Sequence, residues 1–253
     1  MAERIESLRN AWSPADPQAL DALLEADVER LRLLSDSSNY VFLADLVHPE
    51  HGTGLGVYKP QRGERPLSDF PYGTLHTREV AAYELARLLG WALVPPTVER
   101  EGPEGLGSLQ LFIPHDPNEH YFELRARPGL HDQLVRLAVF DLVANNADRK
   151  GGHMLLDAAG SIWAIDNALS FHHHPKVRTV IWDFAGEAAP DPLLADLRRV
   201  RDCLRAEEPS AEALRCCLRP NEVDALIERC DEFLGDPVLP EMFPWRCVPW
   251  PLI

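Results

Sequence analysis

Apolar residues in the first part of the chain follow a helical period and then a strand period. Residues 17–34 carry leucines among charges at helical spacing, which predicts one amphipathic helix. The apolar segments 40–47 (YVFLADLV) and 55–60 (LGVYKP) flank the turn-rich HPEHGTG and predict two strands joined as a hairpin. Two more strands are predicted over 94–99 and 108–114, around REGPEGLG.

One helix interrupts these strands. Thr77 is placed to cap it, the apolar residues between Ala81 and Leu89 share one face, and Gly90 is placed to end it. Residues 35–114 therefore predict a small sheet that carries one helix.

The second half of the chain has mainly helical spacing. A proline-punctuated stretch at 114–120 (PHDPNEH) reads as a hinge, and leucines and valines between 134 and 143 predict a helix. The segments 154–157 (MLLD) and 161–166 (SIWAID) predict a short hairpin, and the remainder reads as helical up to the tail FPWRCVPWPLI. The pattern predicts an α+β protein with an N-terminal helical extension (1–34), a sheet-rich N-lobe (35–114) and a helical C-lobe (115–253).

Composition narrows the classes of partner. The chain has 253 residues, 45% of them hydrophobic, which is enough for a substantial core. Its net charge of -15 argues against nucleic acid as a partner. The charged first thirty residues do not resemble a signal peptide, and no apolar run reaches membrane-spanning length, so we expect a cytoplasmic protein without integral membrane association. The five cysteines lack the spacing of a zinc site or a disulfide framework and are expected to be reduced, mostly buried thiols.

Two aspartates lie at the same end of the predicted hairpin. The helix leads to Asp148, and the returning strand ends at Asp166. Two neighbouring carboxylates favour a divalent cation, and Mg²⁺ prefers oxygen ligands together with phosphate. Phosphoryl transfer uses one acid for the acceptor hydroxyl, another for the metal, and a lysine for the phosphates. Lys59, on a predicted strand, qualifies as that lysine.

These residues also carry a family resemblance. NNADRKGGHMLL followed by WAIDNALSF resembles the catalytic and metal-binding loops of the phosphatidylinositol 3-/4-kinase superfamily, most like the type II phosphatidylinositol 4-kinases and a largely actinobacterial kinase-like family. YKPQRGERPLSDFPYGTLHTREVAAYELARLLGWALVPPTV and GSLQLF match the bacterial family in order and spacing, so the likeness covers roughly residues 35 to 185. It implies a protein-kinase-like bilobal fold with ATP between the lobes.

The resemblance also implies residue roles. Asp148 would be the catalytic aspartate, Asp166 the metal aspartate, and Glu79 the partner of Lys59, which contacts the phosphates. The loop 35–39 would cover the phosphates and 110–114 would form the adenine-side hinge, so the implied nucleotide-binding residues are Ser37, Ser38, Asn39, Lys59, Gln110, Phe112 and Ile113.

The chain departs from the lipid kinases at two positions. His153 stands where they have a metal-binding asparagine, and imidazole makes Mn²⁺ as plausible as Mg²⁺. Asn167 and Ala168 follow Asp166 where a glycine is usual, which stiffens the metal loop. His153 therefore stands between a metal ligand and a structural replacement.

Other residues have simpler interpretations. Lys59, Glu79 and Glu84 have solvated alternatives as surface charges, and Asp148 has one as a helix-end turn residue. Asp141 is expected to be a structural acid bonded to backbone or arginine. The run 172–174 (HHH) is expected to be an exposed loop, because consecutive side chains diverge.

The acceptor is open on sequence grounds. The family likeness suggests an inositol lipid, whereas the acidic balance argues against an anionic membrane, so a protein or a small molecule is at least as plausible. The alternatives are an enzyme that transfers AMP and a pseudokinase that binds ATP without turnover. The tail, with Trp245 and Trp250, either covers the helical lobe or binds a protein partner.

Overall fold

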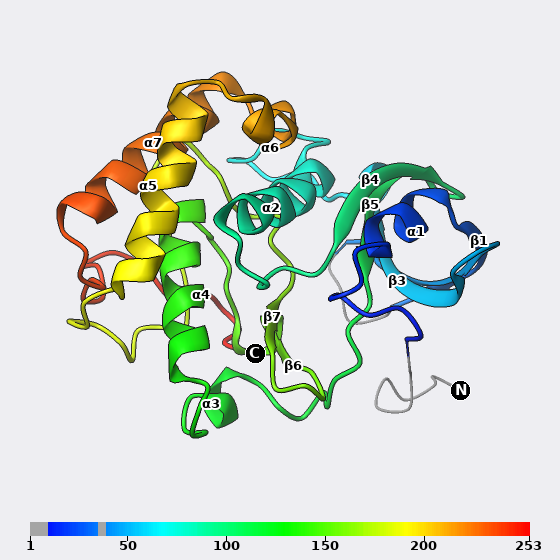
Figure 1. Ribbon diagram of the computed structural model, residues 1–253, viewed down its shortest axis with the longest axis horizontal. Helices are drawn as coiled ribbons and strands as arrows, with labels where there is room; N and C mark the ends of the chain where they lie inside the picture. Colours follow the sequence, from blue (N-terminus) through cyan, green and yellow to red (C-terminus); the bar gives the residue numbers. More distant parts are fainter. Residues whose placement is uncertain (1–9, 35–38) are drawn as a thin grey trace.

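The computed structural model describes residues 10–34 and 39–253, which form a sheet-rich part and a helical part (Figure 1). The first part contains α1 (Ala19–Glu25), β1 (Asp27–Leu33), β2 (Phe42–His48), β3 (Gly52–Pro60), η2 (Gln61–Gly63), α2 (Leu75–Leu89), β4 (Thr97–Gly102) and β5 (Gly105–Leu111). The second contains α3 (Tyr121–Leu124), α4 (His131–Ala144), η3 (Gly151–His153), β6 (Met154–Leu156), β7 (Ile162–Ala164), α5 (Asp191–Arg205), η4 (Pro209–Ala211), α6 (Glu212–Cys217) and α7 (Pro220–Gly235).

The five-stranded sheet has the order β1-β2-β3-β5-β4, with every neighbouring pair antiparallel. The predicted hairpin is present: β2 covers 42–48 instead of 40–47, and β3 begins at Gly52 instead of Leu55, because pairing continues to His48 opposite Gly52. The two later strands also pair as predicted, around a tight turn in which Gly102 faces Gly105. In the register between β3 and β5, Lys59 lies opposite Ser108 and Val57 lies opposite Gln110.

Two of the predicted helix boundaries are wrong. The helix expected over 17–34 ends at Glu25, because Ala26 is extended and Asp27–Leu33 pairs with β2 as an edge strand. The cap expected at Thr77 lies inside α2, which begins after Thr74, whereas Gly90 ends the helix in the left-handed conformation as predicted. The leucine spacing was misleading because leucines on both segments face the same small core, and a helix and a strand share that pattern over a short length.

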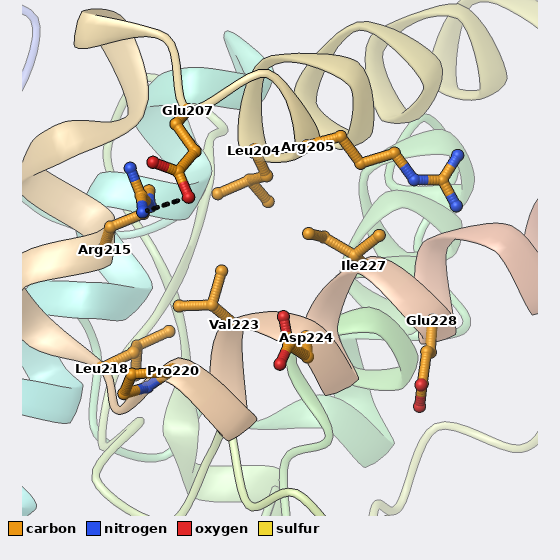
Figure 2. Close-up of a pocket in the computed structure, with 10 residues that line it drawn as sticks. All are labelled: Leu204, Arg205, Glu207, Arg215, Leu218, Pro220, Val223, Asp224, Ile227 and Glu228. Carbon is orange, nitrogen blue, oxygen red and sulfur yellow. Dashed lines mark ion pairs between the residues drawn. The ribbon is translucent and has the colours of Figure 1, made fainter.

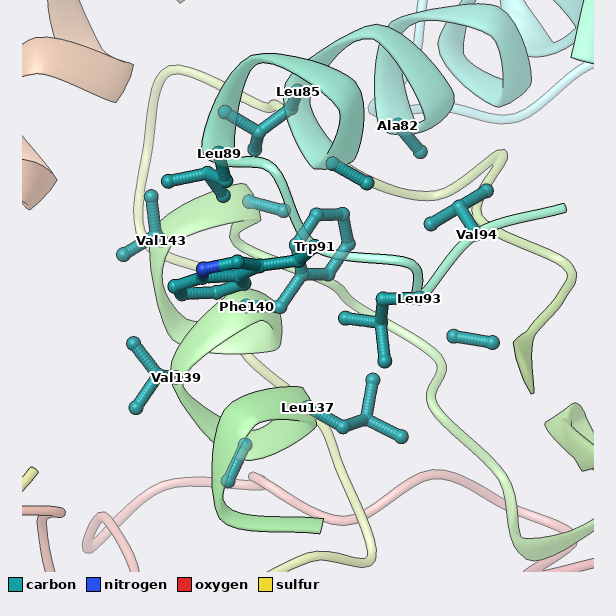
Figure 3. Close-up of a cluster of buried hydrophobic side chains, with 14 of the residues drawn as sticks. Ala82, Leu85, Leu89, Trp91, Leu93, Val94, Leu137, Val139, Phe140 and Val143 are labelled. Carbon is teal, nitrogen blue, oxygen red and sulfur yellow. The ribbon is translucent and has the colours of Figure 1, made fainter. Parts of the chain in front are cut away.

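Helix α2 lies between the sheet and the helices of the second part (Figure 1). It contacts β4 and β5 on one side and α5 and α6 on the other. Its buried residues Ala82, Leu85 and Leu89 pack with Trp91 and with α4 residues such as Phe140 (Figure 3). The sheet has a smaller core of its own, against which α1 packs. Thus the one helix of the sheet-rich segment is built into the larger core.

The helical part matches the prediction in its main features. The hairpin of β6 and β7 pairs Met154 with Ala164 and Leu156 with Ile162. The expectation of helix after this hairpin is wrong for residues 165–190, which are turns and loops held by backbone hydrogen bonds to the α4–β6 connection. Among the described residues, no helix has both the length and the apolar character needed to cross a bilayer.

Gly107 allows β5 to approach β3 beside Lys59, and replacing it should destabilise the sheet. A Cβ atom at Gly107 would lie 2.5 Å from the carbonyl oxygen of Lys59 and 2.7 Å from Cα of Pro60, and backbone cannot yield cheaply. We expect Gly107→Ala to lower the free energy of unfolding by about 1–3 kcal/mol, measured by urea denaturation. Gly235→Ala is the control, because a Cβ there meets nothing within 4 Å, and it should leave stability unchanged or slightly raised. Equal stability of Gly107→Ala and wild type would contradict this packing.

Candidate active site

Lys59 on β3 lies between two carboxylates. Its Nζ is 2.5 Å from Oε1 of Glu79 on α2 and 2.8 Å from Oδ1 of Asp166, which follows β7. These residues are 20 and 107 positions away in the sequence. The three side chains predicted as phosphate contact, its partner and metal aspartate therefore meet at one point.

The other carboxylate oxygen of Glu79 binds the loop that carries Asp166. Oε2 accepts a hydrogen bond of 2.9 Å from the backbone N–H of Asn167. Glu84, the alternative on the same helix, instead pairs with Arg87 on the surface. The structure thus distinguishes the two acids: Glu79 is buried at the cleft and Glu84 forms an ordinary pair within the helix.

The charges in this group stabilise one another. Burial alone would lower the pKa of Lys59, but the carboxylates of Asp166 and Glu79 outweigh burial and hold that pKa above its ordinary value. The positive charge of Lys59 in turn lowers the pKa of Asp166 below its usual range. Lys59 is therefore cationic and Asp166 anionic at neutral pH.

Asp148 lies in the connection between α4 and η3. Asn145 ends α4 in the left-handed conformation, which turns the chain, and Oδ1 of Asn146 accepts a hydrogen bond of 2.9 Å from the N–H of Asp148. Burial raises the pKa of Asp148, Lys150 opposes this shift, and the negative charge of Asp166 adds to it. Asp148 is therefore close enough to Asp166 to be influenced by its charge, as the hairpin argument predicted.

A buried ion pair between Arg149 and Asp141 supports the same connection between α4 and η3. The guanidinium of Arg149 donates to both carboxylate oxygens of Asp141 at 3.0–3.1 Å, and both side chains are fully buried. The same guanidinium donates to the carbonyl of Ile165 at 2.6 Å and to Oδ1 of Asn167 at 2.5 Å. This confirms Asp141 as a structural acid bonded to an arginine, and it links the Asp148 and Asp166 loops.

His153 lies at the end of η3, with Nε2 3.3 Å from Oδ2 of Asp166. Burial lowers the pKa of this imidazole to about 4, so the ring is neutral near pH 7. Nδ1 accepts a hydrogen bond of 3.4 Å from the backbone N–H of Lys150, so the ring proton is on Nε2 and faces Oδ2 of Asp166. Binding of a metal through Nε2 requires the other tautomer, without the Lys150 hydrogen bond. The structure therefore brings together the two residues predicted to hold a metal.

Asp166 and His153 suit a metal ion that takes most of its ligands from phosphate and water. Within residues 10–34 and 39–253, no cluster of three or more histidines, cysteines or acids has metal-binding geometry. Mg²⁺ commonly uses one or two carboxylates together with phosphate oxygens and water. Asp166, whose side chain is 46% exposed, fits that type of site, with His153 beside it.

The predicted nucleotide-binding residues have mixed outcomes. Ser37 and Ser38 lie outside the described residues. Asn39 lines a small cavity of about 60 Å³ together with Lys59, Asp166 and His76, and its Oδ1 accepts a hydrogen bond from the N–H of Arg65. Asn39, from the predicted phosphate loop, and Lys59 therefore line the same small cavity.

Several polar groups of residues 110–114 already form hydrogen bonds with other parts of the protein. The Gln110 side chain is buried and donates to Oγ1 of Thr97 at 2.9 Å, the Phe112 N–H donates to Leu55, and the Phe112 carbonyl accepts from Asn10. The carbonyl of Ile113 is 2.7 Å from Nδ1 of His115, while its N–H has no hydrogen-bond partner among the described residues. The Ile113 N–H is thus the backbone donor of this segment that the described residues leave unpaired.

The histidine run is only partly exposed. His173 and His174 are exposed as predicted, but His172 is buried, with its ring edge-on to Phe70 and its carbonyl bound by the side chain of Asn145. The exposed-loop prediction is therefore wrong for His172. All five cysteines are free, as expected, but only Cys230 and Cys247 are buried, so the expectation of mostly buried thiols is wrong.

A larger cavity lies away from these residues. It has a volume of about 540 Å³ and lies among α5, α6 and α7, with an apolar floor that includes Val223 and Ile227 and a charged rim that includes Arg205 and Asp224 (Figure 2). None of the predicted site residues lines it. We therefore assign the chemistry to the Lys59 cleft, where the charged groups converge.

Three side chains at or beside the cleft were missed by the sequence reasoning. Lys150 pairs with Asp148 at 3.1 Å, and Arg78 and Glu222 form a buried ion pair behind Glu79. The chain has only three lysines, and one of them two positions after Asp148 was a usable signal. Nothing in the sequence pointed to Arg78 and Glu222, which are 144 residues apart.

The C-terminal tail returns to this region. The carbonyl of Leu252 accepts a hydrogen bond of 2.7 Å from Gly151, and the carbonyl of Cys247 accepts one of 3.0 Å from Thr179. Trp245 and Trp250 nevertheless remain 54% and 77% exposed. The tail therefore covers part of the helical lobe, and a protein partner for its exposed tryptophans stays a prediction.

Two solved structures resemble this chain in fold, whereas no model of a known protein family matches it. The structure of hydra Fam20 with sugar superposes with a TM-score of 0.54 at 18% identity, covering 85% of this chain and 87% of that one. The crystal structure of the Helicobacter pylori proinflammatory kinase CtkA superposes with a TM-score of 0.50 at 10% identity, covering 86% and 94%. These similarities confirm the α+β, bilobal kinase-like fold.

One curated relative resembles the whole chain in sequence. Protein Rv2133c of Mycobacterium tuberculosis (strain ATCC 25618 / H37Rv) is 37% identical over 266 residues, which cover 90% of this chain and 93% of that protein. This chain, with its kinase-like fold, belongs to the family of Protein Rv2133c.

Proposed function

We propose that the protein is a kinase-like phosphotransferase that binds ATP with Mg²⁺ or Mn²⁺. The observation that carries the proposal is the contact of Lys59 with both Glu79 and Asp166, with Asp148 on the adjoining loop. Phosphoryl transfer depends mostly on positioning and on electrostatic stabilisation, and these residues supply both. The cytoplasm, where ATP is plentiful, is the proposed location.

Each residue has a role that follows from its contacts. Lys59 binds phosphate oxygens, and Glu79 holds the lysine and the Asn167 backbone in place. Asp148 orients the acceptor hydroxyl and accepts its proton, and its raised pKa makes it a better base than an exposed aspartate. Lys150, paired with Asp148, lies where it can bind the phosphate that is transferred. Asp166 and His153 are the protein ligands of the metal, which when bound neutralises charge on the phosphates.

The acceptor is a separate question. The resemblance to phosphatidylinositol 3-/4-kinases supports an inositol lipid, whereas a net charge of -15 disfavours docking on an anionic bilayer. A protein or a small polar molecule is therefore an equal candidate. His153, in the place of the usual asparagine, favours a pseudokinase that binds ATP without turnover as the alternative. Transfer of AMP on the same fold is the other alternative.

Binding of nucleotide and metal is the first measurement. If Lys59 and Asp166 frame the site, ATP with Mg²⁺ or Mn²⁺ should raise the melting temperature, because a ligand at about 100 times its dissociation constant adds roughly 2.7 kcal/mol of stability. The measurement is a thermal melt with and without chelator, followed by an ATP turnover assay over lipid, protein and small-molecule acceptors. Absence of any thermal shift with either metal at millimolar ATP would refute the proposal. The mass added to the product separates phosphate from AMP transfer.

Replacement of Asp148 and replacement of Asp166 should impair different steps. Asp148→Asn should keep metal-dependent nucleotide binding and lose turnover by about 10²–10⁴-fold, because only the acceptor proton is affected. Asp166→Asn should lose both turnover and the metal-dependent part of binding, because a negative ligand is removed. Calorimetric titration with a non-hydrolysable ATP analogue, with and without metal, distinguishes the variants. The roles would be wrong if the two binding results were exchanged.

His153 should set the metal preference. His153→Asn replaces an imidazole with an amide oxygen, a harder ligand that suits Mg²⁺ better than Mn²⁺. We expect the ratio of Mg²⁺-supported to Mn²⁺-supported activity to rise in this variant, measured at saturating ATP over a range of metal concentrations. His115→Asn is the matched control, since His115 contacts the Ile113 carbonyl and neither aspartate. An unchanged ratio would leave His153 with a structural role only.

A further inference from the structure

Helix α2 belongs to the core of the helical part, although its sequence lies among the strands. Its residues Ala82, Leu85 and Leu89 pack with α4 residues such as Phe140 (Figure 3). They belong to one buried cluster that also includes residues of α5 and α7, while the sheet and α1 form a separate cluster. Packing of this kind favours joint motion of α2 with the helical lobe. The position of Glu79 is therefore set mainly by that lobe.

Polar contacts hold both ends of α2 to the same lobe. At the C-terminal end, Arg199 of α5 donates to the carbonyls of Leu88 at 2.7 Å and Leu89 at 3.2 Å, which are two otherwise unpaired helix-end acceptors. Near the N-terminal end, Arg78 is 1% exposed and forms an ion pair with Glu222 of α7.

Arg78 also reaches the loop that carries Asp166. Its Nη1 donates to the carbonyl of Ser170 at 2.6 Å, and its guanidinium lies 5.0 Å from the ring centre of Phe70. Glu79, the next residue on α2, accepts from the N–H of Asn167. Two neighbouring side chains of α2 therefore bind the segment 166–170 at two points, one as donor and one as acceptor.

Stability alone is a weak explanation of the Arg78–Glu222 pair. Removing two charges from water costs several kcal/mol per ion in general, and an apolar pair of similar size is often as stable. Glu222 already has a local use, since its Oε2 accepts from the N–H of Arg219 at the start of α7. We therefore explain the Arg78–Glu222 pair by the position in which it holds α2 against the helical lobe.

We propose that Arg78 is a positioning residue for the proposed phosphotransfer site: by pairing with Glu222 and the Ser170 carbonyl, it fixes α2 against the helical lobe so that Glu79 holds Asn167, and with it Asp166. This inference rests on the proposed function only in calling the site a phosphotransfer site. The contact of Glu79 with Asn167, which it makes dependent on Arg78, can be measured without nucleotide.

The test is hydrogen exchange of the Asn167 amide in the ligand-free protein. Arg78→Met alone leaves Glu222 buried without its partner and is expected to unfold more easily. Arg78→Met combined with Glu222→Gln removes both charges and keeps an oxygen for the Arg219 N–H. In this double variant we expect the Asn167 amide to exchange about tenfold faster or more, with amides of β3 unchanged, because Glu79 no longer holds it.

Cys230→Ala, a cavity variant farther along α7, is the matched control for lost stability. It should lower the melting temperature without selectively exposing the Asn167 amide. The proposal is overturned if the double variant keeps wild-type exchange at Asn167, or if Cys230→Ala accelerates that amide equally. If wild type shows no turnover, the proposed function fails, and the exchange result still decides the role of Arg78. If turnover exists, the double variant should lose at least about tenfold in kcat.

Discussion

The buried carboxylate of Glu79 joins the two sides of the cleft. One oxygen binds the ammonium of Lys59 on the sheet and the other binds the Asn167 amide on the loop after β7. A buried carboxylate is costly unless both oxygens are paired, so this one residue requires the sheet, α2 and the loop to be in place together. The register of β3 against β5, which puts Lys59 opposite Ser108, is therefore part of what places the lysine beside Glu79.

Two buried arginines hold the loops on either side of that carboxylate. Arg149, paired with Asp141, binds the Ile165 carbonyl and the Asn167 side chain, and Arg78, paired with Glu222, binds the Ser170 carbonyl. The segment from Ile165 to Ser170 has no regular secondary structure, and Asp166 has a positive φ. Backbone in such a conformation persists only where its surroundings determine it. The buried charges thus supply the order that a strand or helix would otherwise give.

Local pattern was enough for the hairpins and for placing Asp148 and Asp166 at the same end of one of them, whereas the choice of Glu79 over Glu84 came from the family resemblance. The strands around Lys59, the hairpin that returns Asp166 and the role of Asp141 follow from alternation, turn residues and short-range spacing. The helix over 17–34 failed because Leu20 and Leu23 of a seven-residue helix and Leu31 of a seven-residue strand pack against the same small core. Arg78 and Glu222 were out of reach for a different reason: their partnership depends on how α2 packs against α7, which no local period encodes.

The assignment of α2 to the helical lobe changes how the cleft can open. If α2 moved with the sheet, opening would separate Glu79 from Asn167 while Lys59 and Glu79 stayed paired. The shared core and the contacts of Arg78 and Arg199 favour the other case, in which α2 stays with the helical lobe and separates from the sheet. Apart from the contact of Lys59, the sheet and α2 share no comparable buried ion pair among the described residues. Opening would then break the contacts of Lys59 with Glu79 and with Asp166 together. In that case Lys59 belongs to the sheet, whereas Glu79 and Asp166 stay with Asp148 on the side of the helical lobe.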